Sequence, residues 1–216
     1  MFLNKHVEHC YITSTLTTHK ERKDEIIGPC GPCSFINLIG LDGSFELEKK
    51  LAEMGRMKPF YASNFTSFLI WSEYFNKEIE VYVENPDISE GTFNMIFKYE
   101  KIPKEKQKEL KEECLRRHSQ IIQKNKDKIH ILKDKPLKVI DDLLSRGYAV
   151  AFNMADYFDK DFLVGHSRVC YQKKNSVYYI KDSREGILKF SKKQMEEQLN
   201  NVKKMKGTFD IIGYKV

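Results

Sequence analysis

A cysteine between two Gly-Pro pairs has a setting that suits a reactive thiol. The stretch Gly28-Pro29-Cys30-Gly31-Pro32 comes directly before an apolar run at 35–39. Because apolar residues at this spacing predict a helix, and proline suits a first helical turn, Cys30 is expected at or just before a helix N-terminus. The unpaired N–H groups and the helix dipole there favour a thiolate over a thiol. Cys30 is therefore the candidate nucleophile.

A nucleophilic thiol needs a base and a group that orients that base. His166 opens a predicted strand at 166–172, and Asp182 directly follows the next predicted strand at 177–181. If these strands pair as a hairpin, both side chains lie at the same end of a sheet. The sequence therefore favours a Cys-His-Asp triad made of Cys30, His166 and Asp182.

Each of these residues also has a purely structural interpretation. A lone histidine such as His166 is most often a surface residue or a satisfied core residue. The carboxylate of Asp182 could bond its own backbone in a turn. Cys33, one helical turn after Cys30, could simply pack into the core. The remaining histidines lie in polar stretches and receive no role: His6, His9, His19, His118 and His130.

The elements that would position the triad follow from hydrophobic periodicity and cap residues. Further helices are expected at 44–55, about 63–75, 101–128, 136–146 and 191–199. Strands are expected at 7–18, 79–83, 148–154, 166–172, 177–181 and 208–216, with a hairpin turn at 173–175. Because the helices come early and an antiparallel sheet comes late, the fold class is α+β.

Length and composition limit the class of protein. A chain of 216 residues with 41% hydrophobic side chains fits one folded domain. The surplus of six positive charges, 37 Lys and Arg against 31 Asp and Glu, is spread along the chain, so no nucleic-acid partner is expected. The chain has no apolar stretch of about 18 residues and no signal peptide, so we expect no membrane association.

The cysteine count indicates a compartment. Five cysteines are an odd number, which favours reduced thiols and a cytoplasmic location over a disulfide framework. Three of them, Cys10, Cys114 and Cys170, are expected to be buried apolar side chains.

Four sequence blocks follow one another along the chain. They are Cys30-Gly31-Pro32-x-Ser34, the helix-to-strand stretch 143–150, Gly165-His166, and Tyr179-Ile180-Lys181-Asp182 with Gly186 after it. In this order they resemble the papain-like cysteine peptidases of the bacteriocin-processing (double-glycine leader peptidase-like) type. The resemblance extends from about residue 30 to residue 198. Within a single catalytic domain, 1–216, the Lys- and Glu-rich segment at about 56–135 is then a helical insertion.

The resemblance implies a papain-like fold, in which an N-terminal nucleophile helix packs on a C-terminal antiparallel sheet. It implies that Cys30 is the nucleophile of a cysteine peptidase or related acyl-transfer enzyme. In that family His166 would be the base, and Asp182 would orient its imidazole. The substrate would be a peptide or protein with a peptide or isopeptide bond to cleave, and no cofactor or metal is implied.

One position departs from the family pattern. Family members usually carry a glutamine six residues before the nucleophile, whose amide helps to hold the oxyanion, whereas this chain has Asp24 there and no glutamine before Cys30. Because an ionised carboxylate would repel the developing negative charge, another donor is needed, such as Thr18, His19 or the backbone N–H of Cys30. The same departure leaves open a catalytically inactive, peptide-binding module.

Two other functions are open for the same cysteines. Cys30-Gly31-Pro32-Cys33 is also the dithiol motif of thioredoxin-like thiol-disulfide oxidoreductases, although the tryptophan and the hydrophobic strand that normally precede it are missing. A zinc site is the other alternative, although a ligand pair in the middle of a strand is uncommon. Its ligands would be Cys30, Cys33, His166 and Cys170.

Two aromatic-rich segments are candidates for the walls of a substrate groove, namely the helix that contains Trp71 and the loop at 156–163. For most of their residues, packing in the core is the alternative role.

Overall fold

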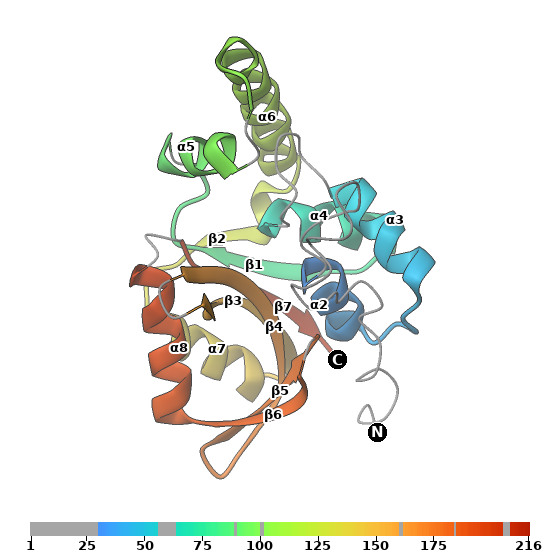
Figure 1. Ribbon diagram of the computed structural model, residues 1–216. Coiled ribbons are helices and arrows are strands. Elements are labelled where there is room, and N and C mark those ends of the chain that lie inside the picture. Colours follow the sequence, from blue (N-terminus) through green and yellow to red (C-terminus); the bar gives the residue numbers. More distant parts are fainter. Residues whose placement is uncertain are drawn as a thin grey trace.

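One mixed β-sheet organises this α+β structure, and helices lie on both of its faces (Figure 1). The structure is a computed structural model, and its described residues are 30–55, 64–88, 90–99, 102–159, 162–183, 185–204 and 208–216. The strand order is β2-β1-β7-β3-β4-β5-β6, and every pair is antiparallel except β1 with β2. The strands are β1 Ile79–Val83, β2 Ile129–Ile131, β3 Tyr148–Asp159, β4 Phe162–Lys174, β5 Val177–Asp182, β6 Gly186–Ser191 and β7 Asp210–Lys215.

Seven α-helices lie within the described residues. They are α2 Cys30–Ile39, α3 Phe45–Gly55, α4 Phe65–Tyr74, α5 Glu90–Tyr99, α6 Lys104–Lys124, α7 Pro136–Ser145 and α8 Lys192–Lys204, and a 3₁₀ helix η1 Lys126–Lys128 comes just before β2. In Figure 1, α2, α3 and α4 lie on one side of the sheet and α7 and α8 on the other, while α5 and α6 extend away from it.

Local sequence signals explain where two of these helices begin. At the start of α4, Asn64 Oδ1 accepts a 3.0 Å hydrogen bond from the N–H of Thr66, and Ser67 completes a capping box. At the start of α8, Gln194 Oε1 accepts from the N–H of Ser191 at 2.8 Å, and Ser191 Oγ accepts from the N–H of Gln194 at 3.3 Å. Such reciprocal bonds satisfy N–H groups that have no partner within the helix. The predicted cap at Ser191 is confirmed.

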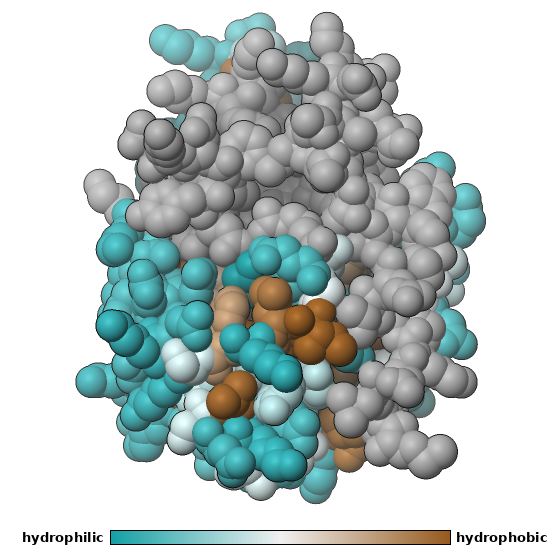
Figure 2. Space-filling model, turned by 60° about the horizontal axis from the view of Figure 1, so that its bottom comes forward, coloured by the Kyte–Doolittle hydropathy of each residue, from teal (hydrophilic) through white to brown (hydrophobic). Residues whose placement is uncertain are grey.

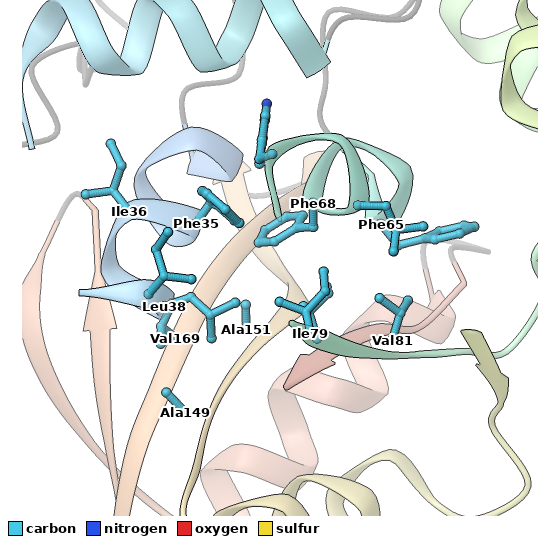
Figure 3. Close-up of a cluster of buried hydrophobic side chains, with 14 of the residues drawn as sticks. Phe35, Ile36, Leu38, Phe65, Phe68, Ile79, Val81, Ala149, Ala151 and Val169 are labelled. Carbon is cyan, nitrogen blue, oxygen red and sulfur yellow. The ribbon is translucent and has the colours of Figure 1, made fainter. Parts of the chain in front are cut away.

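Alternation along the strands divides the core into two clusters. Ala151 of β3 and Val169 of β4 pack with α2 and α4, whereas Phe152 of β3 and Cys170 of β4 pack with α7 and α8. Because successive strand side chains point to opposite faces, β3 and β4 each contribute to both clusters. Figure 3 shows the first cluster, in which side chains of α2 and α4 meet those of the sheet. This packing holds α2 against β4.

The β3–β4 hairpin differs from its prediction. A loop was expected at 156–163, but Asp156 pairs with Val164 and Tyr157 with Leu163 in a continuing antiparallel ladder. The aromatic residues Tyr157, Phe158 and Phe162 favour a strand, and here pairing with the neighbouring strand outweighs the turn preference of aspartate. The loop prediction is therefore wrong for most of its residues.

The turn between β4 and β5 is tighter than predicted. The expected turn at 173–175 gives way to a two-residue turn at Asn175 and Ser176, with φ of 49° and 61°. Positive φ at both central residues matches the twist of a hairpin. Lys173 and Lys174 therefore belong to the ladder, where they pair with β5.

The segment at about 56–135 is more than the expected helical insertion. It supplies β1 and β2, which are the two strands at one edge of the sheet. Helices α5 and α6 form a small core of their own around Phe93, Phe97 and Cys114. Three elements of the structure, β2, α5 and β6, were not predicted, and the predicted strand at 7–18 lies outside the described residues.

The described residues on one face of the molecule are mainly polar (Figure 2). Figure 2 brings the lower face of Figure 1 forward, and it shows a few hydrophobic residues surrounded by hydrophilic ones. Scattered apolar residues of this kind are normal for a folded domain. None of the described helices combines the length and the apolar character needed to cross a bilayer.

Candidate active site

The candidate nucleophile begins a helix, as its sequence predicts. Cys30 is the first residue of α2 and is a free, partly exposed thiol. One turn later, Ser34 Oγ donates a 2.8 Å hydrogen bond to the backbone oxygen of Ser167. This bond fixes the start of α2 against β4, directly beside His166.

His166 contacts both of the other predicted site residues. Its side chain is 6% exposed, and its Nε2 lies 2.9 Å from Asp182 Oδ2. Its ring also hydrogen-bonds the side chain of Cys30. Because an ionised carboxylate only accepts, Nε2 carries the proton in the bond to Asp182. Nδ1 is then the ring nitrogen left for Cys30.

The surroundings of His166 favour its charged form. Burial alone would lower the pKa of the imidazole, since a buried charge loses solvation. The hydrogen bonds to Asp182 and Cys30, together with the negative charge of those groups, outweigh burial and raise the pKa of His166 to about 9. The ring therefore carries a positive charge at neutral pH while it faces Cys30.

Asp182 is held by three donors. His166 Nε2 and Arg168 Nε donate to its Oδ2, and the backbone N–H of Glu185 donates to its Oδ1 at 3.0 Å. Burial would raise the pKa of this carboxyl, but the bonds and positive charges of His166 and Arg168 hold the pKa of Asp182 well below its usual range. The carboxylate therefore stays ionised although it is fully buried.

Two residues of this site, Arg168 and Glu185, escaped the sequence reasoning. Arg168 Nη2 lies 3.3 Å from Glu185 Oε1, and its Nε bonds the same Asp182 oxygen as His166. Arg168 follows His166 by two positions on one strand, so the two side chains point to the same face. That period of two was the signal that could have identified Arg168.

The two cysteines of the predicted dithiol motif are not bonded to each other. Cys33 is disulfide-bonded and 2% exposed, whereas Cys30 is a free thiol. The expectation of reduced thiols is therefore wrong for Cys33. A dithiol oxidoreductase needs the second cysteine of the motif to resolve a bond at the first, and here Cys33 is bonded elsewhere.

The proposed zinc site also lacks a complete set of ligands. Cys33 is held in a disulfide, so its sulfur is not a thiolate ligand. Cys170 is buried, as predicted, and burial raises the pKa of its thiol to about 12. Cys114 is likewise buried, with a pKa raised by burial to about 12. In the part of the chain that the structure describes, no three His, Cys, Asp or Glu side chains are grouped to hold a metal ion.

Other candidate residues have structural roles or lie outside the described residues. Trp71 is fully buried, and its Nε1 donates a 2.7 Å hydrogen bond to the backbone oxygen of Leu51, so it belongs to the core and does not line a groove. His118, which was expected in a polar setting, is only 3% exposed, and its Nε2 lies 2.6 Å from the backbone oxygen of Pro86. The side chains at 156–163 and the residues Asp24, Thr18 and His19 lie outside the described residues.

Comparison with known proteins adds no relative. No protein-family model, no curated protein and no solved structure matches the chain. The residues themselves and their geometry therefore carry the functional argument.

Proposed function

We propose that this chain is a cysteine peptidase, or a related acyl-transfer enzyme, that cleaves a peptide or isopeptide bond in a peptide or protein substrate. The single observation that carries the proposal is the continuous hydrogen bonding from Cys30 through His166 to Asp182. A nucleophile, a base and a group that orients the base form the minimal set for covalent acyl transfer. The proposed fold is papain-like, with α2 as the nucleophile helix against the antiparallel strands β3, β4 and β5.

The proposed resting state is an ion pair between the Cys30 thiolate and the His166 imidazolium. The interaction between two titrating groups is mutual, so the positive charge on His166 favours the thiolate as much as the thiolate favours the imidazolium. The position of Cys30 at the N-terminus of α2 acts in the same direction. The nucleophile is therefore formed before the substrate binds.

In the first half-reaction, the thiolate sulfur of Cys30 attacks the substrate carbonyl carbon, and the carbonyl electron pair moves onto oxygen. The intermediate collapses as His166 gives its Nδ1 proton to the leaving amine nitrogen and the C–N bond breaks. The product is a thioester on Cys30. Asp182 stays ionised throughout and holds the ring in its reactive orientation.

In the second half-reaction, His166 removes a proton from water or from an acceptor amine, which attacks the thioester carbon. The C–S bond breaks, and the thiolate of Cys30 returns. Water gives hydrolysis, and an amine gives transfer. The backbone N–H of Cys30, at the start of α2, is a donor suited to the oxyanion in both steps.

Alkylation of the protein with iodoacetamide, mapped by peptide mass spectrometry across pH, tests this proposal without a known substrate. We expect Cys30 to react rapidly at neutral pH in the wild type, because the thiolate is already present. His166→Ala should slow that reaction about tenfold or more, since the thiol returns towards an ordinary pKa. Cys30→Ala should abolish the fast label altogether.

The chain provides internal controls. Cys114 and Cys170 are buried with pKa values of about 12, so neither should label before unfolding. His130→Ala, which removes an exposed histidine on β2, should leave the rate at Cys30 unchanged. A Cys30 that labels slowly at neutral pH, with or without His166, would refute the peptidase proposal and favour an inactive binding module.

A further inference from the structure

Arg168 is a buried cation at a site whose triad chemistry does not require one. Its side chain is 2% exposed, and its Nε donates to Oδ2 of Asp182. That oxygen is the one that also accepts the bond from His166 Nε2. Two cationic side chains therefore share one carboxylate oxygen.

Arg168 also contacts Glu185, Met154 and Phe190. Its Nη2 lies 3.3 Å from Glu185 Oε1, but the side chain of Glu185 is 56% exposed, so solvent screens that pair. Its Nη1 lies 3.3 Å from Met154 Sδ, and its guanidinium lies 5.7 Å from the centre of the Phe190 ring. Because a buried guanidinium is costly unless it is paired, the bond to the fully buried carboxylate of Asp182 stabilises Arg168 in this position.

The charges that face His166 come from several elements. Cys30 contributes from α2, Asp182 from β5 and Arg168 from β4, while Glu185 lies in the turn before β6 and reaches Arg168. With a thiolate at Cys30, the three buried side chains and the cysteine carry two positive and two negative charges. The negative charge of Asp182 is therefore divided between an imidazolium and a guanidinium.

We propose that Arg168 is a positioning residue of this site: by sharing Oδ2 of Asp182 with His166, it fixes the carboxylate and limits the negative charge that the imidazole feels. This inference rests on the proposed function for its catalytic meaning. An imidazolium that faced an undivided Asp182 charge would be too stable and would release its proton slowly to a leaving amine. Arg168 thus allows the His166 imidazolium to release its proton readily to the leaving amine.

The test is the titration of the His166 ring by NMR in variants of Arg168, with His166→Gln to assign its signal. Arg168→Gln keeps a donor for Asp182 but removes the charge, and Arg168→Met removes both. Because a like charge within about 4–6 Å shifts a pKa by about one unit or more, either neutral variant that folds should raise the His166 midpoint by about one pH unit above the wild type. An unchanged or lowered midpoint would overturn the proposal.

Two further variants separate charge from structure. Arg168→Lys restores the positive charge and should return the His166 midpoint to the wild-type value, and a midpoint that stays displaced in Arg168→Lys would count against the proposal. Arg146→Met, which removes an exposed arginine paired with Glu80 and Asp142, should leave the midpoint unchanged. Arg168 acting only as a packing residue would lower the stability of its variants without moving the titration.

The titration needs neither substrate nor a reactive thiol, so its failure is distinct from failure of the proposed function. Slow alkylation of Cys30 combined with a raised midpoint in Arg168→Gln would refute the peptidase but retain the electrostatic role of Arg168. Fast alkylation combined with an unmoved midpoint would retain the peptidase and refute the role of Arg168.

Discussion

Ser34 Oγ and the backbone oxygen of Ser167 are joined by a buried 2.8 Å hydrogen bond that spans 133 positions of the chain. Ser34 lies one helical turn after Cys30, and Ser167 directly follows His166. The bond therefore connects the helix that carries the candidate nucleophile to the strand that carries the candidate base. Because the bond joins chain neighbours of Cys30 and His166, its removal tests whether the distance between those two side chains matters.

Ser34→Ala is expected to lower both stability and the reactivity of Cys30. Loss of the hydroxyl leaves the buried carbonyl of Ser167 without this donor, which costs about 1 kcal/mol or more of unfolding free energy. A looser α2 should also reduce the alkylation rate of Cys30 at neutral pH by roughly tenfold, since small displacements are costly in a positioned pair. Denaturant unfolding and the alkylation assay measure the two effects.

The matched control is Ser72→Ala in α4. Ser72 is also fully buried, and its Oγ donates to the Leu69 oxygen at 2.9 Å, but this bond lies within its own helix. We expect a comparable loss of stability and no change in the reactivity of Cys30. Equal losses of reactivity in both variants would show that Ser34 acts through general stability alone.

Asp182→Asn is expected to narrow the pH range over which Cys30 is activated. Asp182 helps to raise the pKa of His166 to about 9, so removal of its charge lowers that pKa and weakens the ion pair. A weaker imidazolium stabilises the thiolate less, so the alkylation rate at neutral pH should fall, by at most about tenfold for each pKa unit that His166 loses. The rise of the alkylation rate with pH, which reports formation of the thiolate, should therefore begin at higher pH in Asp182→Asn than in the wild type.

Glu185→Gln is the control for this prediction. Its side chain is largely exposed and contacts Arg168, while its backbone N–H, which the substitution keeps, donates to Asp182. The alkylation profile should therefore change little. A profile that shifts as much in Glu185→Gln as in Asp182→Asn would contradict the central role of the Asp182 carboxylate.

Much of the site was predictable from the sequence because Cys30 begins a helix and Asp182 ends a strand, although His166 lies inside β4 and does not open it as predicted. The Gly-Pro pattern around Cys30 predicts a helix start, and the α2 boundary agrees. The neighbouring strands that carry His166 and Asp182 predict side chains at one end of the sheet, and the 2.9 Å contact agrees. The buried pair of Arg168 with Asp182 was not predictable with the same ease, because its burial depends on residues distant in the chain.

The helices and strands that have a clear local hydrophobic pattern were predictable from the sequence. Alternating apolar residues predict β1 correctly, and the apolar run after Gly147 predicts the start of β3. The strands β2 and β6 have little burial of their own and were missed. These edge strands depend on pairing with a neighbour, as does the extension of β3 to Asp159. Long-range pairing of this kind leaves little trace in the local sequence.

Gly55→Ala is expected to destabilise the protein by overpacking. A Cβ at this position would lie 2.7 Å from Trp71 Cζ2, and Trp71 is fully buried and held by its bond to Leu51. Overpacking of this kind costs about 1–3 kcal/mol of unfolding free energy. Gly147→Ala provides the contrast, because its Cβ meets nothing within 4 Å and its cost of about 1–2 kcal/mol comes from a φ of +83°.

A double-mutant cycle distinguishes these two mechanisms. Trp71→Phe shortens the ring system that the new methyl group would meet, so it should relieve part of the cost of Gly55→Ala. The same substitution should add simply to Gly147→Ala, since the two positions share no contact. Urea unfolding of the single and double variants measures both couplings, and simple additivity with Gly55→Ala would contradict the predicted contact.

Asp210 gives the protein a separate pH dependence of stability. It is 6% exposed, its Oδ2 accepts a 3.1 Å bond from Asn153 Nδ2, and burial raises its pKa to about 7 against the lowering effects of the Phe65 N–H and Asn153. A folded-state pKa above the unfolded value of 3.8 means that the folded protein binds the extra proton. Its contribution to stability is full below about pH 4 and is lost as pH rises to about 7.

Asp210→Asn should remove this dependence, because the amide stays neutral and still offers an oxygen to Asn153. We expect the variant to match the wild type near pH 4 and to be more stable above pH 7. Between these two pH values the difference in unfolding free energy should grow by at most about 1.4 kcal/mol per pH unit. The window differs from that of His166, whose raised pKa removes stability between about 6.5 and 9. Asp134→Asn, at an exposed carboxylate paired with Lys138, should show no such trend in denaturant unfolding, and parallel pH curves for Asp210→Asn and the wild type would contradict the assignment.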